Sequence, residues 1–342
     1  MRIALDGMGG DQAPAVVVEG AARALKEGPP DLELILVGQP EALEPEMRRV
    51  GLSQTRARLQ AASQVAGMAD SPSSVLRHQR DSSIRVAFDL HKAGEADAVV
   101  SAGNSGATMA VGMVVMGRMP EVDRPALASV LPGLSGPTVV IDVGANVDCS
   151  SLMLLQFGYM GSVYAESVLG IKEPKVGILS IGEEGGKGNT VVKQAYDYLK
   201  NSPLNFVGNV EGRDLFDGDV AVVVCDGFVG NVCLKLTEGL VDNLTQLLKR
   251  EVLATMRGKL GGALLRPTLK NLSHRLDYAQ YGGAPLLGIN GVAYICHGAS
   301  SAQAIASAVR MACESVAGGF TGHLAQGLER YRGALLGFDD QP

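Results

Sequence analysis

A glycine-rich segment follows directly on the first apolar strand that the sequence predicts. Residues 3–5 are apolar, and residues 6–14 read Asp-Gly-Met-Gly-Gly-Asp-Gln-Ala-Pro. Three glycines in four positions allow positive φ angles and close backbone approach, and Pro14 suits the first turn of a following helix. A plain strand-to-helix turn needs only one glycine. The segment therefore indicates a ligand site at the end of a buried strand, with an ordinary turn as the alternative.

Short β-branched and apolar runs recur along the chain, separated mostly by stretches of helical length. Near-continuous apolar runs such as residues 220–224 are typical of strands buried on both faces in a parallel sheet between helices. We therefore predict a three-layer α/β/α fold with a mainly parallel sheet, formed by one domain over residues 1–342. The predicted strands are 32–37, 98–101, 138–142, 175–181, 205–210, 220–226 and 292–295.

Composition and charge exclude several classes of protein. The 342 residues carry a formal net charge of −6, which argues against a nucleic-acid binder. Five widely spaced cysteines without a C-x-x-C pair suggest neither a disulfide framework nor a zinc site. The apolar run before Asp6 is too short for a signal peptide, and no run approaches the ~18 residues of a membrane span. We expect a cytoplasmic protein without a metal.

Several of the predicted strands end in loops that suit a ligand, and such loops meet at the carboxyl edge of a parallel sheet. In residues 101–108, Asn104 or Ser105 can cap a helix whose free N–H groups favour an anion such as phosphate, although an ordinary helix start is equally compatible. Lys187 lies among glycines in residues 182–190, but no Walker pattern surrounds it, which disfavours an ATPase. No G-x-G-x-x-G follows a strand, which disfavours a nicotinamide enzyme. The other such loops are 142–146, 208–212, 226–231 and 282–288.

Histidine and cysteine residues provide few further candidates. His297 follows the predicted strand 292–295 and suits a strand-end site, although it can equally cap a helix. The other four histidines are typical of helix surfaces or loops. Cys149 and Cys225 have no histidine nearby in sequence and cysteine is commonly buried, which disfavours a nucleophilic role.

Residues 231–281 depart from the alternation of strands and helices. The leucines at 236, 240 and 244 have helical spacing, and Gly258, Gly261, Gly262 and Pro267 interrupt the pattern before it resumes. We predict a projecting helical hairpin. Leucines around its tip have seven neighbouring Lys and Arg residues against Glu251 alone. Such a segment can lie on an anionic membrane surface, and a dimerisation hairpin is the alternative.

Seven phrases, in the same order over nearly the whole chain, resemble those of the PlsX phosphate acyltransferases. The resemblance implies a fold related to phosphotransacetylases and isocitrate-dehydrogenase-like enzymes, usually as a homodimer. The chain departs from the family pattern at Gly7, Ser105 and Ser180, where alanine, threonine and asparagine are more usual, and Ser180 leaves an amide role at that position in doubt. The phrases are 6–14, 101–107, 142–146, 182–189, 208–212, 226–231 and 282–288.

The resemblance also implies a reaction: a long-chain acyl group passes from acyl-(acyl carrier protein) to inorganic phosphate, without a cofactor. The acyl phosphate then serves a membrane glycerol-3-phosphate acyltransferase at the start of phospholipid synthesis. Membrane contact by the hairpin fits this role, and a basic docking face for the acidic carrier protein becomes a further alternative. A dehydrogenase on a related fold and a non-catalytic membrane-associated scaffold are the rival functions.

The chemistry needs position and charge rather than a covalent intermediate, because phosphate is the nucleophile and a thioester is already activated. The conspicuous loops provide the predicted site residues. Catalytic roles are predicted for Lys187, Asn189, Asn104 and His297. Substrate or phosphate binding is predicted for Asp6, Gly9, Gly10, Gly103, Ser105, Asp142, Asn146, Asp226 and Asn231. Membrane contact is predicted for Leu253, Met256, Leu260, Leu264 and Leu265.

Overall fold

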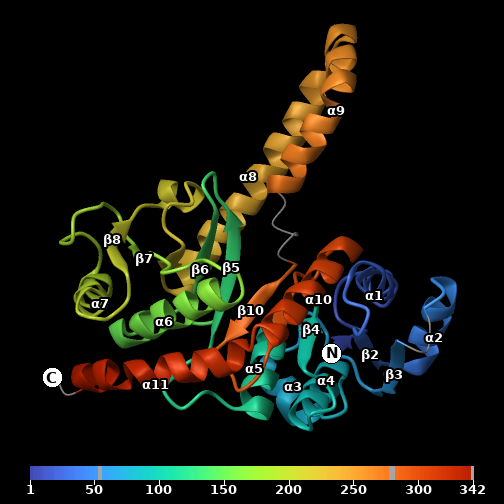
Figure 1. Ribbon diagram of the computed structural model, residues 1–342. Coiled ribbons are helices and arrows are strands. Elements are labelled where there is room, and N and C mark those ends of the chain that lie inside the picture. Colours follow the sequence, from blue (N-terminus) through green and yellow to red (C-terminus); the bar gives the residue numbers. More distant parts are fainter. Residues whose placement is uncertain (53–55, 277–281, 340–342) are drawn as a thin grey trace.

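The structure, a computed structural model, describes residues 1–52, 56–276 and 282–339. Within these residues one sheet has the strand order β3-β2-β1-β4-β11-β10-β5-β6-β9-β7-β8, and helices cover both of its faces (Figure 1). The predicted three-layer α/β class is confirmed. The strands are β1 (Arg2–Asp6), β2 (Glu33–Gly38), β3 (Ala57–Ala61), β4 (Ala98–Ser101), β5 (Ala126–Pro132), β6 (Pro137–Ile141), β7 (Val176–Leu179), β8 (Phe206–Val210), β9 (Val222–Val224), β10 (Ala284–Leu287) and β11 (Ala293–Ile295).

The helices divide between the two faces of the sheet, because successive side chains of a strand point to opposite sides. Ile3 and Leu5 of β1 belong to one apolar core, together with residues of α1, α6, α10 and α11, and Ala4 belongs to a second core with α3, α4 and α5. The helices are α1 (Ala15–Glu27), α2 (Pro40–Arg49), α3 (Pro72–His78), α4 (Ser83–Lys92), α5 (Ser105–Met116), α6 (Ser151–Ser167), α7 (Thr190–Lys200), the 3₁₀ helix η1 (Gly212–Phe216), α8 (Gly227–Ala254), α9 (Met256–Leu276), α10 (Ala302–Ala317) and α11 (Phe320–Asp339).

An antiparallel pair, β10 and β5, lies in the middle of the sheet and was not predicted. The sequence assigned residues 282–288 to a loop, but residues 284–287 form β10. Because β10 is antiparallel to β11 and to β5, and β5 is antiparallel to β6, the parallel strands on the two sides run in opposite directions.

The register of these central strands brings the carboxyl ends of the two sides together. Tyr294 of β11 pairs with Pro285 of β10, and the next residue of β10, Leu286, pairs with Leu127 of β5. The residue that ends β6, Ile141, pairs in turn with the residue after Leu127. Strands β11 and β6 therefore end at nearly the same level of the sheet, although they point in opposite directions. The loops that follow them can face a common space.

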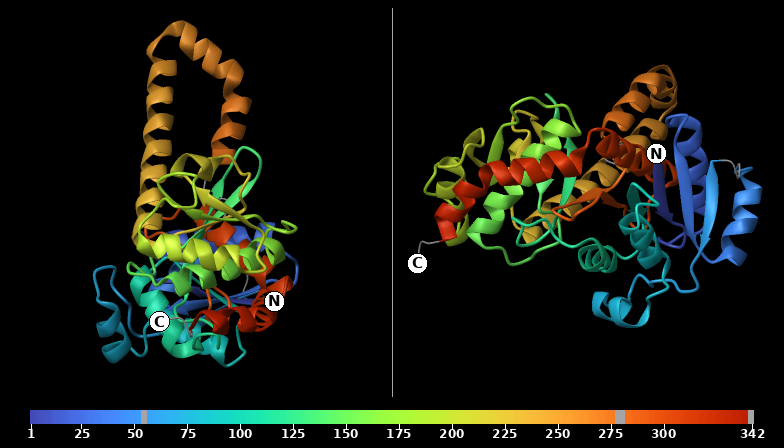
Figure 2. Two further views of the ribbon diagram at one scale, coloured as in Figure 1. Left: turned by 90° about the vertical axis from the view of Figure 1, so that its left-hand side faces the viewer. Right: turned by 60° about the horizontal axis from the view of Figure 1, so that its bottom comes forward.

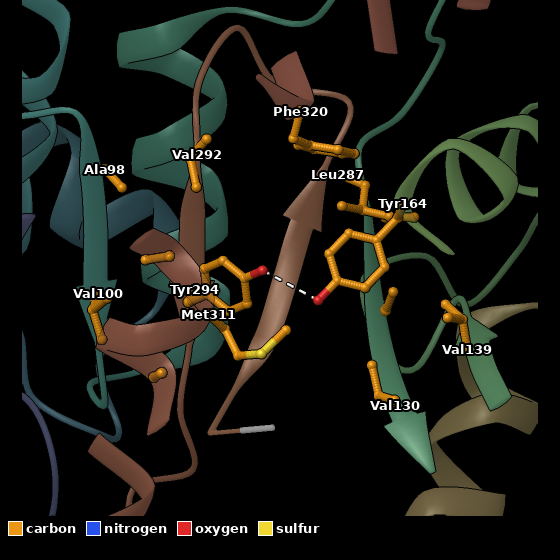
Figure 3. Close-up of a cluster of buried hydrophobic side chains, with 14 of the residues drawn as sticks. Ala98, Val100, Val130, Val139, Tyr164, Leu287, Val292, Tyr294, Met311 and Phe320 are labelled. Atoms are coloured by element: carbon orange, nitrogen blue, oxygen red, sulfur yellow. Dashed lines mark hydrogen bonds between the residues drawn. The ribbon is translucent and has the colours of Figure 1, made fainter. Parts of the chain in front are cut away.

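A cluster of buried side chains links β11 with three helices in the middle of the molecule (Figure 3). The hydroxyl of Tyr294 lies 3.1 Å from that of Tyr164 in α6 and 2.7 Å from Oγ of Ser315 in α10. Tyr164 also packs edge-on against Phe320 of α11. Burial raises the pKa of Tyr294 to about 12, so the hydroxyl stays neutral. This packing supports our proposal that the chain forms one domain.

Helices α8 and α9 contact each other and project from the body as a helical hairpin (Figures 1 and 2). The break lies at Thr255 rather than at the predicted glycines and Pro267, all of which lie inside α9. Close packing explains one of these glycines, since a Cβ at Gly262 would lie 2.5 Å from Cγ1 of Val252 in α8. Residues 277–281 of the predicted hairpin lie outside the described residues. Among the described residues, no helix combines the length and apolar character needed to cross a membrane.

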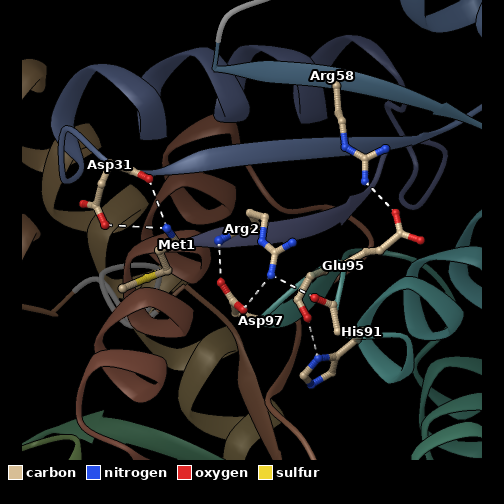
Figure 4. A network of polar contacts seen from close by, with 9 residues as sticks. Met1, Arg2, Asp31, Arg58, His91, Glu95 and Asp97 are labelled. Carbon is tan, nitrogen blue, oxygen red and sulfur yellow. Dashed lines mark hydrogen bonds and ion pairs between the residues drawn. The ribbon is translucent and has the colours of Figure 1, made fainter.

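A polar network surrounds the amino ends of β1 and β4, at the edge of the sheet away from the glycine-rich loop (Figure 4). The backbone N–H of Arg2 donates to Asp97 over 2.7 Å. His91 lies in a helix, α4, in keeping with the predicted helix surface or loop, but its ring is half-buried and both of its nitrogens are bonded. Its Nε2 accepts from the N–H of Val292 over 3.0 Å, so Nδ1 carries the proton and donates to the carbonyl of Ala96 over 2.9 Å.

The half-buried ring of His91 predicts a pH-dependent stability. Burial lowers the pKa of His91 below its ordinary value of 6.5, so on acidification the unfolded chain takes up this proton first. Stability is therefore complete above that ordinary value and is lost as the pH falls through the lower folded-state pKa. We expect the free energy of unfolding to fall more between about pH 7.5 and about pH 5 in the parent than in His91→Gln, measured by chemical denaturation.

The exposed His78 provides the control, because His78→Gln removes a histidine without removing the half-buried ring of His91. This variant should keep the parent's dependence on pH. An equal loss of stability in His91→Gln and in the parent on acidification would show that the ring of His91 does not cause the pH dependence.

Candidate active site

A cavity of about 700 Å³ lies between the first turns of α8 and the loops that follow β6 and β11. Its volume is in the range of binding sites for small organic ligands. Ser105 and His297 line it from one side of the sheet, and Gly144 and Asn231 line it from the other. Strand β5 contributes Ser129 and its apolar neighbours to the wall between them. The register of the central strands thus produces a single cavity from both sides.

Two helices begin at this cavity, α5 with Ser105 and α10 immediately after Ser301. The side chain of Asn104 caps α5 by accepting from the N–H of Ala107 over 3.0 Å, and Ser301 caps α10 in the same way. The first N–H groups of a helix have no partner within it, and they carry the positive end of the helix dipole. The two helix starts therefore favour an anion in the cavity.

The amide of Asn104 is fully engaged by the protein. Its Nδ2 donates to the carbonyls of Gly67, Met68 and Asp70 over 3.3, 3.0 and 2.8 Å, while its Oδ1 caps α5. Asn104 itself does not line the cavity. This residue holds the start of α5 against residues 67–70, and the predicted catalytic role of its side chain stays a prediction.

His297 lines the cavity, and among the described residues only one of its ring nitrogens has a hydrogen-bond partner. Its Nδ1 accepts from the backbone N–H of Ala299 over 3.1 Å, and an N–H can only donate, so the neutral ring carries its proton on Nε2. The side chain is exposed and lines the cavity. Nε2–H is thus available to donate to a ligand, as a catalytic or binding group requires.

Asp142 is fully buried and organises the opposite wall. Its carboxylate accepts from the backbone N–H groups of Leu127, Gly144, Ala145 and Asn146 and from the side-chain amide of Asn146, over 2.6 to 3.1 Å. Burial raises the pKa of Asp142, and these bonds oppose that rise. With its oxygens already bonded to N–H groups, the carboxylate fixes Gly144, which lines the cavity, and does not reach the cavity itself.

The start of α8 is seated on the same loop. The side chain of Asp226 caps the helix by accepting from the N–H of Val229 over 2.8 Å, and the N–H of Gly227 donates to the carbonyl of Asn146 over 2.7 Å. A Cβ at Gly230 would overlap the carbonyl oxygen of Asp142. This close contact between α8 and the loop after β6 places Asn231, in the next turn of α8, at the cavity. Of the predicted residues in this region, Asp142, Asn146 and Asp226 build the wall and Asn231 lines it.

The glycine-rich loop after β1 packs against other loops of the protein. A Cβ at Gly9 would lie 2.6 Å from the backbone nitrogen of Gly103, and one at Gly10, whose φ is 110°, would lie 3.1 Å from the carbonyl oxygen of Gly298. The sequence predicted that these glycines let the backbone come close to a ligand. At Gly9 and Gly10, however, the group that lies close is the backbone of another loop of the protein. Asp6, Gly9, Gly10 and Gly103 do not line the cavity.

Lys187 and Asn189 lie in the loop after β7 and do not line the cavity. Both are exposed. The side chain of Asn189 caps α7 by accepting from the N–H of Val192 over 2.9 Å, while the backbone N–H of Lys187 donates to the carbonyl of Glu184 over the same distance. A catalytic role for these two residues stays a prediction.

The structure thus brings three of the predicted site residues to one cavity: Ser105, Asn231 and His297. Sequence reasoning missed the contribution of β5 and of the start of α10. Ser301 had a usable signal, because a serine directly before a helix is a preferred N-cap and it follows His297 closely. Strand β5 had no comparable signal.

The cysteines near this site are unsuited to nucleophilic chemistry. Burial, followed by the nearby Asp142, raises the pKa of the Cys149 thiol to about 12. Burial likewise raises that of Cys225 well above its ordinary value. Thiolate, the reactive form, is therefore disfavoured at both. In the part of the chain that the structure describes, no cluster of His, Cys, Asp and Glu is arranged to hold a metal ion.

Comparison with known proteins assigns the class. The model of a family described as fatty acid synthesis protein matches residues 1–322. A phosphate acyltransferase of Geobacter sulfurreducens is 51% identical over 329 residues, covering 96% of this chain and 94% of the relative. Another, of Nitratidesulfovibrio vulgaris, is 53% identical over 315 residues, covering 92% and 91%.

The chain therefore belongs to the fatty acid synthesis protein family, the PlsX family that its motifs resemble, and it is an acyltransferase. Solved structures agree on the fold. A phosphotransacetylase of Streptococcus pyogenes has a TM-score of 0.64 at 18% identity, covering 93% of this chain and 94% of its own. A branched-chain phosphotransacylase of Enterococcus faecalis V583 has a TM-score of 0.60 at 15% identity, covering 92% and 99%.

The geometry of His297 predicts different effects for two substitutions. Asparagine can keep an acceptor near the position of Nδ1 but has no donor near Nε2, whereas glutamine can offer an N–H there. We expect His297→Asn to lower the acyl-transfer rate by about 10²-fold and His297→Gln to retain more activity. Steady-state kinetics measures both effects, with thermal melting as a check on folding. Full activity in His297→Asn would rule out a contribution from Nε2–H.

Proposed function

We propose that this enzyme transfers a long-chain acyl group from the thioester of acyl-(acyl carrier protein) to inorganic phosphate, giving acyl phosphate for phospholipid synthesis. The observation that carries the proposal is the pair of helix starts, α5 and α10, at one cavity together with the Nε2–H of His297. An anion-binding pair of helix starts suits phosphate, and the apolar residues of β5 and β11 in the same cavity suit an acyl group.

The reaction needs no covalent enzyme intermediate. A phosphate oxygen attacks the thioester carbonyl carbon, a C–O bond forms, and the carbonyl oxygen takes negative charge. The C–S bond then breaks, its electron pair leaves with sulfur, and the thiolate takes a proton from solvent. Because the thiol of the leaving group has an ordinary pKa near ~8.5, it needs little help from an acid.

The residues at the cavity supply position and charge stabilisation. The free N–H groups at the starts of α5 and α10 would hold phosphate, and Nε2–H of His297 would donate to the developing oxyanion. Holding the two reactants together can contribute up to ~7–11 kcal/mol by avoiding the entropy of encounter. Asn231 and Gly144 would form the opposite side of the cavity.

Membership of an acyltransferase family sets aside the two rival functions, the dehydrogenase and the non-catalytic scaffold. What distinguishes the present proposal from other acyl transfers is the acceptor. The names of the relatives support phosphate as acceptor, since they are phosphate acyltransferases. The carrier-protein donor and the acyl phosphate product are our proposal.

Phosphate dependence tests this proposal. Acyl carrier protein charged with palmitate is incubated with the enzyme and phosphate, and acyl phosphate is trapped with hydroxylamine as the hydroxamate. We expect hydroxamate and free carrier protein to form together, and only when phosphate is present. Sulfate replaces phosphate in the control, because it tests an anion of similar shape. Thioester cleavage at the same rate without phosphate would overturn the proposal.

We also propose that the tip of the α8–α9 hairpin contacts an anionic membrane, so that the enzyme is cytoplasmic and peripherally attached. The apolar tip residues are exposed, with Met256 at 80% and Leu264 at 77%. Exposed cations flank them, and their attraction to anionic lipids adds about 1 kcal/mol each. Attachment would deliver an apolar product close to the membrane glycerol-3-phosphate acyltransferase that uses it. The flanking cations are Lys249, Arg250, Arg257, Lys259 and Arg266.

A different face of α8 supports the proposal of a homodimer. Leu236, Leu240 and Leu244 are more than half exposed and follow one another at four-residue spacing. With 3.6 residues per turn, this row lies roughly opposite Asn231 and Lys235, which line the cavity. A second copy that covered the row would leave the cavity open to the carrier protein. Docking of the carrier protein on the hairpin cations stays an alternative use of the tip.

Vesicle binding tests the membrane proposal. Replacing Leu253, Leu260 and Leu264 by Ala removes apolar area that contributes roughly 25 cal/mol per Å² when buried, so several kcal/mol of membrane binding should be lost. We expect little co-sedimentation of this variant with anionic vesicles and unchanged turnover in solution. High salt should weaken binding of the parent in part, because it screens only the cations.

The matched control replaces Leu236, Leu240 and Leu244 by Ala. It makes the same change in the exposed row of α8, which does not belong to the tip. This second variant should sediment with vesicles like the parent and should weaken self-association, which sedimentation velocity measures. If the tip variant sediments like the parent, the membrane proposal fails. If the tip variant is the one that becomes monomeric, the hairpin tip is a dimer contact.

A further inference from the structure

We infer that Ser101 and Asp6 are positioning residues that set the distance between the start of α5 and His297. The inference rests on the proposed function, in which these two parts of the cavity act on the same reaction. Neither residue reaches the cavity. Ser101 is completely buried and Asp6 is 3% exposed, so neither side chain can contact the substrate directly.

Ser101 ends β4, and its two neighbours in the sheet are the strands that lead to the relevant loops. On one side Val100 pairs with Leu5, which brings Asp6 opposite Ser101 at the end of β1. On the other side Ser101 pairs with Ile295, and its carbonyl accepts from the N–H of Cys296 over 2.8 Å. The residue after Cys296 is His297. The backbone of Ser101 therefore holds the strand end that carries the histidine.

The side chain of Ser101 holds the other part of the cavity. Its hydroxyl donates to Oδ2 of Asp6 over 2.7 Å and accepts from the N–H of Gly103 over 3.0 Å. Gly103 precedes Asn104, the cap of α5, by one residue. The hydroxyl thus connects a buried carboxylate, through two hydrogen bonds, with the turn that begins α5. A single residue fixes both the helix start and the strand end.

The glycine-rich loop after β1 also contacts both parts of the cavity wall. Asp6 accepts from the N–H of Met8 over 3.3 Å, which folds the loop back over the carboxylate. Gly9 then packs on Gly103, and the N–H of Asp11 donates to the carbonyl of Gly298 over 2.8 Å. The loop therefore touches the turn before α5 and the turn after His297 at once. This explains Gly9 and the carboxylate of Asp6 without a ligand in contact with them.

The rate of acyl transfer should depend on the relative position of the start of α5 and His297. The phosphate oxygen held at the start of α5 must lie at bonding distance from the thioester carbonyl carbon, whose oxyanion His297 stabilises. A displacement of about 1 Å between catalytic groups can cost about 10²-fold in rate. Loss of the Ser101 hydroxyl frees the turn at Gly103 while the backbone bond to Cys296 remains, so the two parts can move relative to each other.

Ser83 of α4 provides a matched control for the experiment. It is as buried as Ser101, at 1% exposure, and its side chain also interacts with Asp6, where it opposes the rise in the pKa of that carboxyl that burial causes. It lies on α4 rather than on a strand that ends at the cavity. Ser83→Ala and Ser101→Ala each remove one buried hydroxyl from the same carboxylate, but only the second removes the contact with Gly103.

The test compares the two variants by thermal melting and by phosphate-dependent hydroxamate formation. We expect both to lower the melting temperature. We expect Ser101→Ala to lower kcat/KM for phosphate by about 10-fold or more, and Ser83→Ala to stay within about 3-fold of the parent. Hydrogen exchange at the N–H groups of Ala107 and Thr108, which both bond to Asn104 at the start of α5, should rise in Ser101→Ala alone, and this readout does not depend on activity.

The possible outcomes separate the inference from the proposed function. A parent enzyme without phosphate-dependent activity would contradict the proposed function. An active parent with equal kinetic losses in the two variants, or with equal exchange at α5, would overturn the inference. If Ser101→Ala does not fold, Ser101→Cys, which keeps a small side chain with only weak hydrogen bonding, must show the same selective loss of kcat/KM.

Discussion

The antiparallel pairing of β10 with β5 is the constraint on which the rest of the structure depends. Without it, the two sets of parallel strands would run in the same direction and all end at one edge of the sheet. If they ran in opposite directions without this register, the loops after β11 and β6 would lie far apart. With it, the strands on the two sides point in opposite directions and β11 and β6 still end at nearly the same level. The cavity between His297 and Asn231 exists because of this register.

The parallel strands could be predicted from the sequence, because buried strands such as β9 are short apolar runs with β-branched residues. The central pair could not. Strand β10 reads Ala-Pro-Leu-Leu after two glycines, and proline is a signal against a central strand. Strand β5 has no strict alternation and ends in proline. What makes them strands is pairing with each other and burial between helices, which are tertiary effects.

The candidate site was predictable in its chemistry more than in its geometry. Conspicuous glycines mark positions where a Cβ is not tolerated, but they do not tell whether the nearby atom belongs to a ligand or to protein. At Gly9 it belongs to Gly103, and at Gly230 to Asp142. Buried carboxylates present the same ambiguity, since Asp142 binds backbone N–H groups of its own loop. His297 could be identified because it follows a strand end and has a ring nitrogen to offer.

The central claim is that phosphate binds in the cavity, at the starts of α5 and α10. The most direct measurement is the position of phosphate in a crystal structure of the enzyme grown with phosphate and a non-hydrolysable acyl-pantetheine thioether. The account predicts phosphate within hydrogen-bonding distance of the first backbone N–H groups of α5 and α10, on the side of His297. Phosphate bound only in the loop of residues 182–189, beside Lys187 and away from His297, would contradict it.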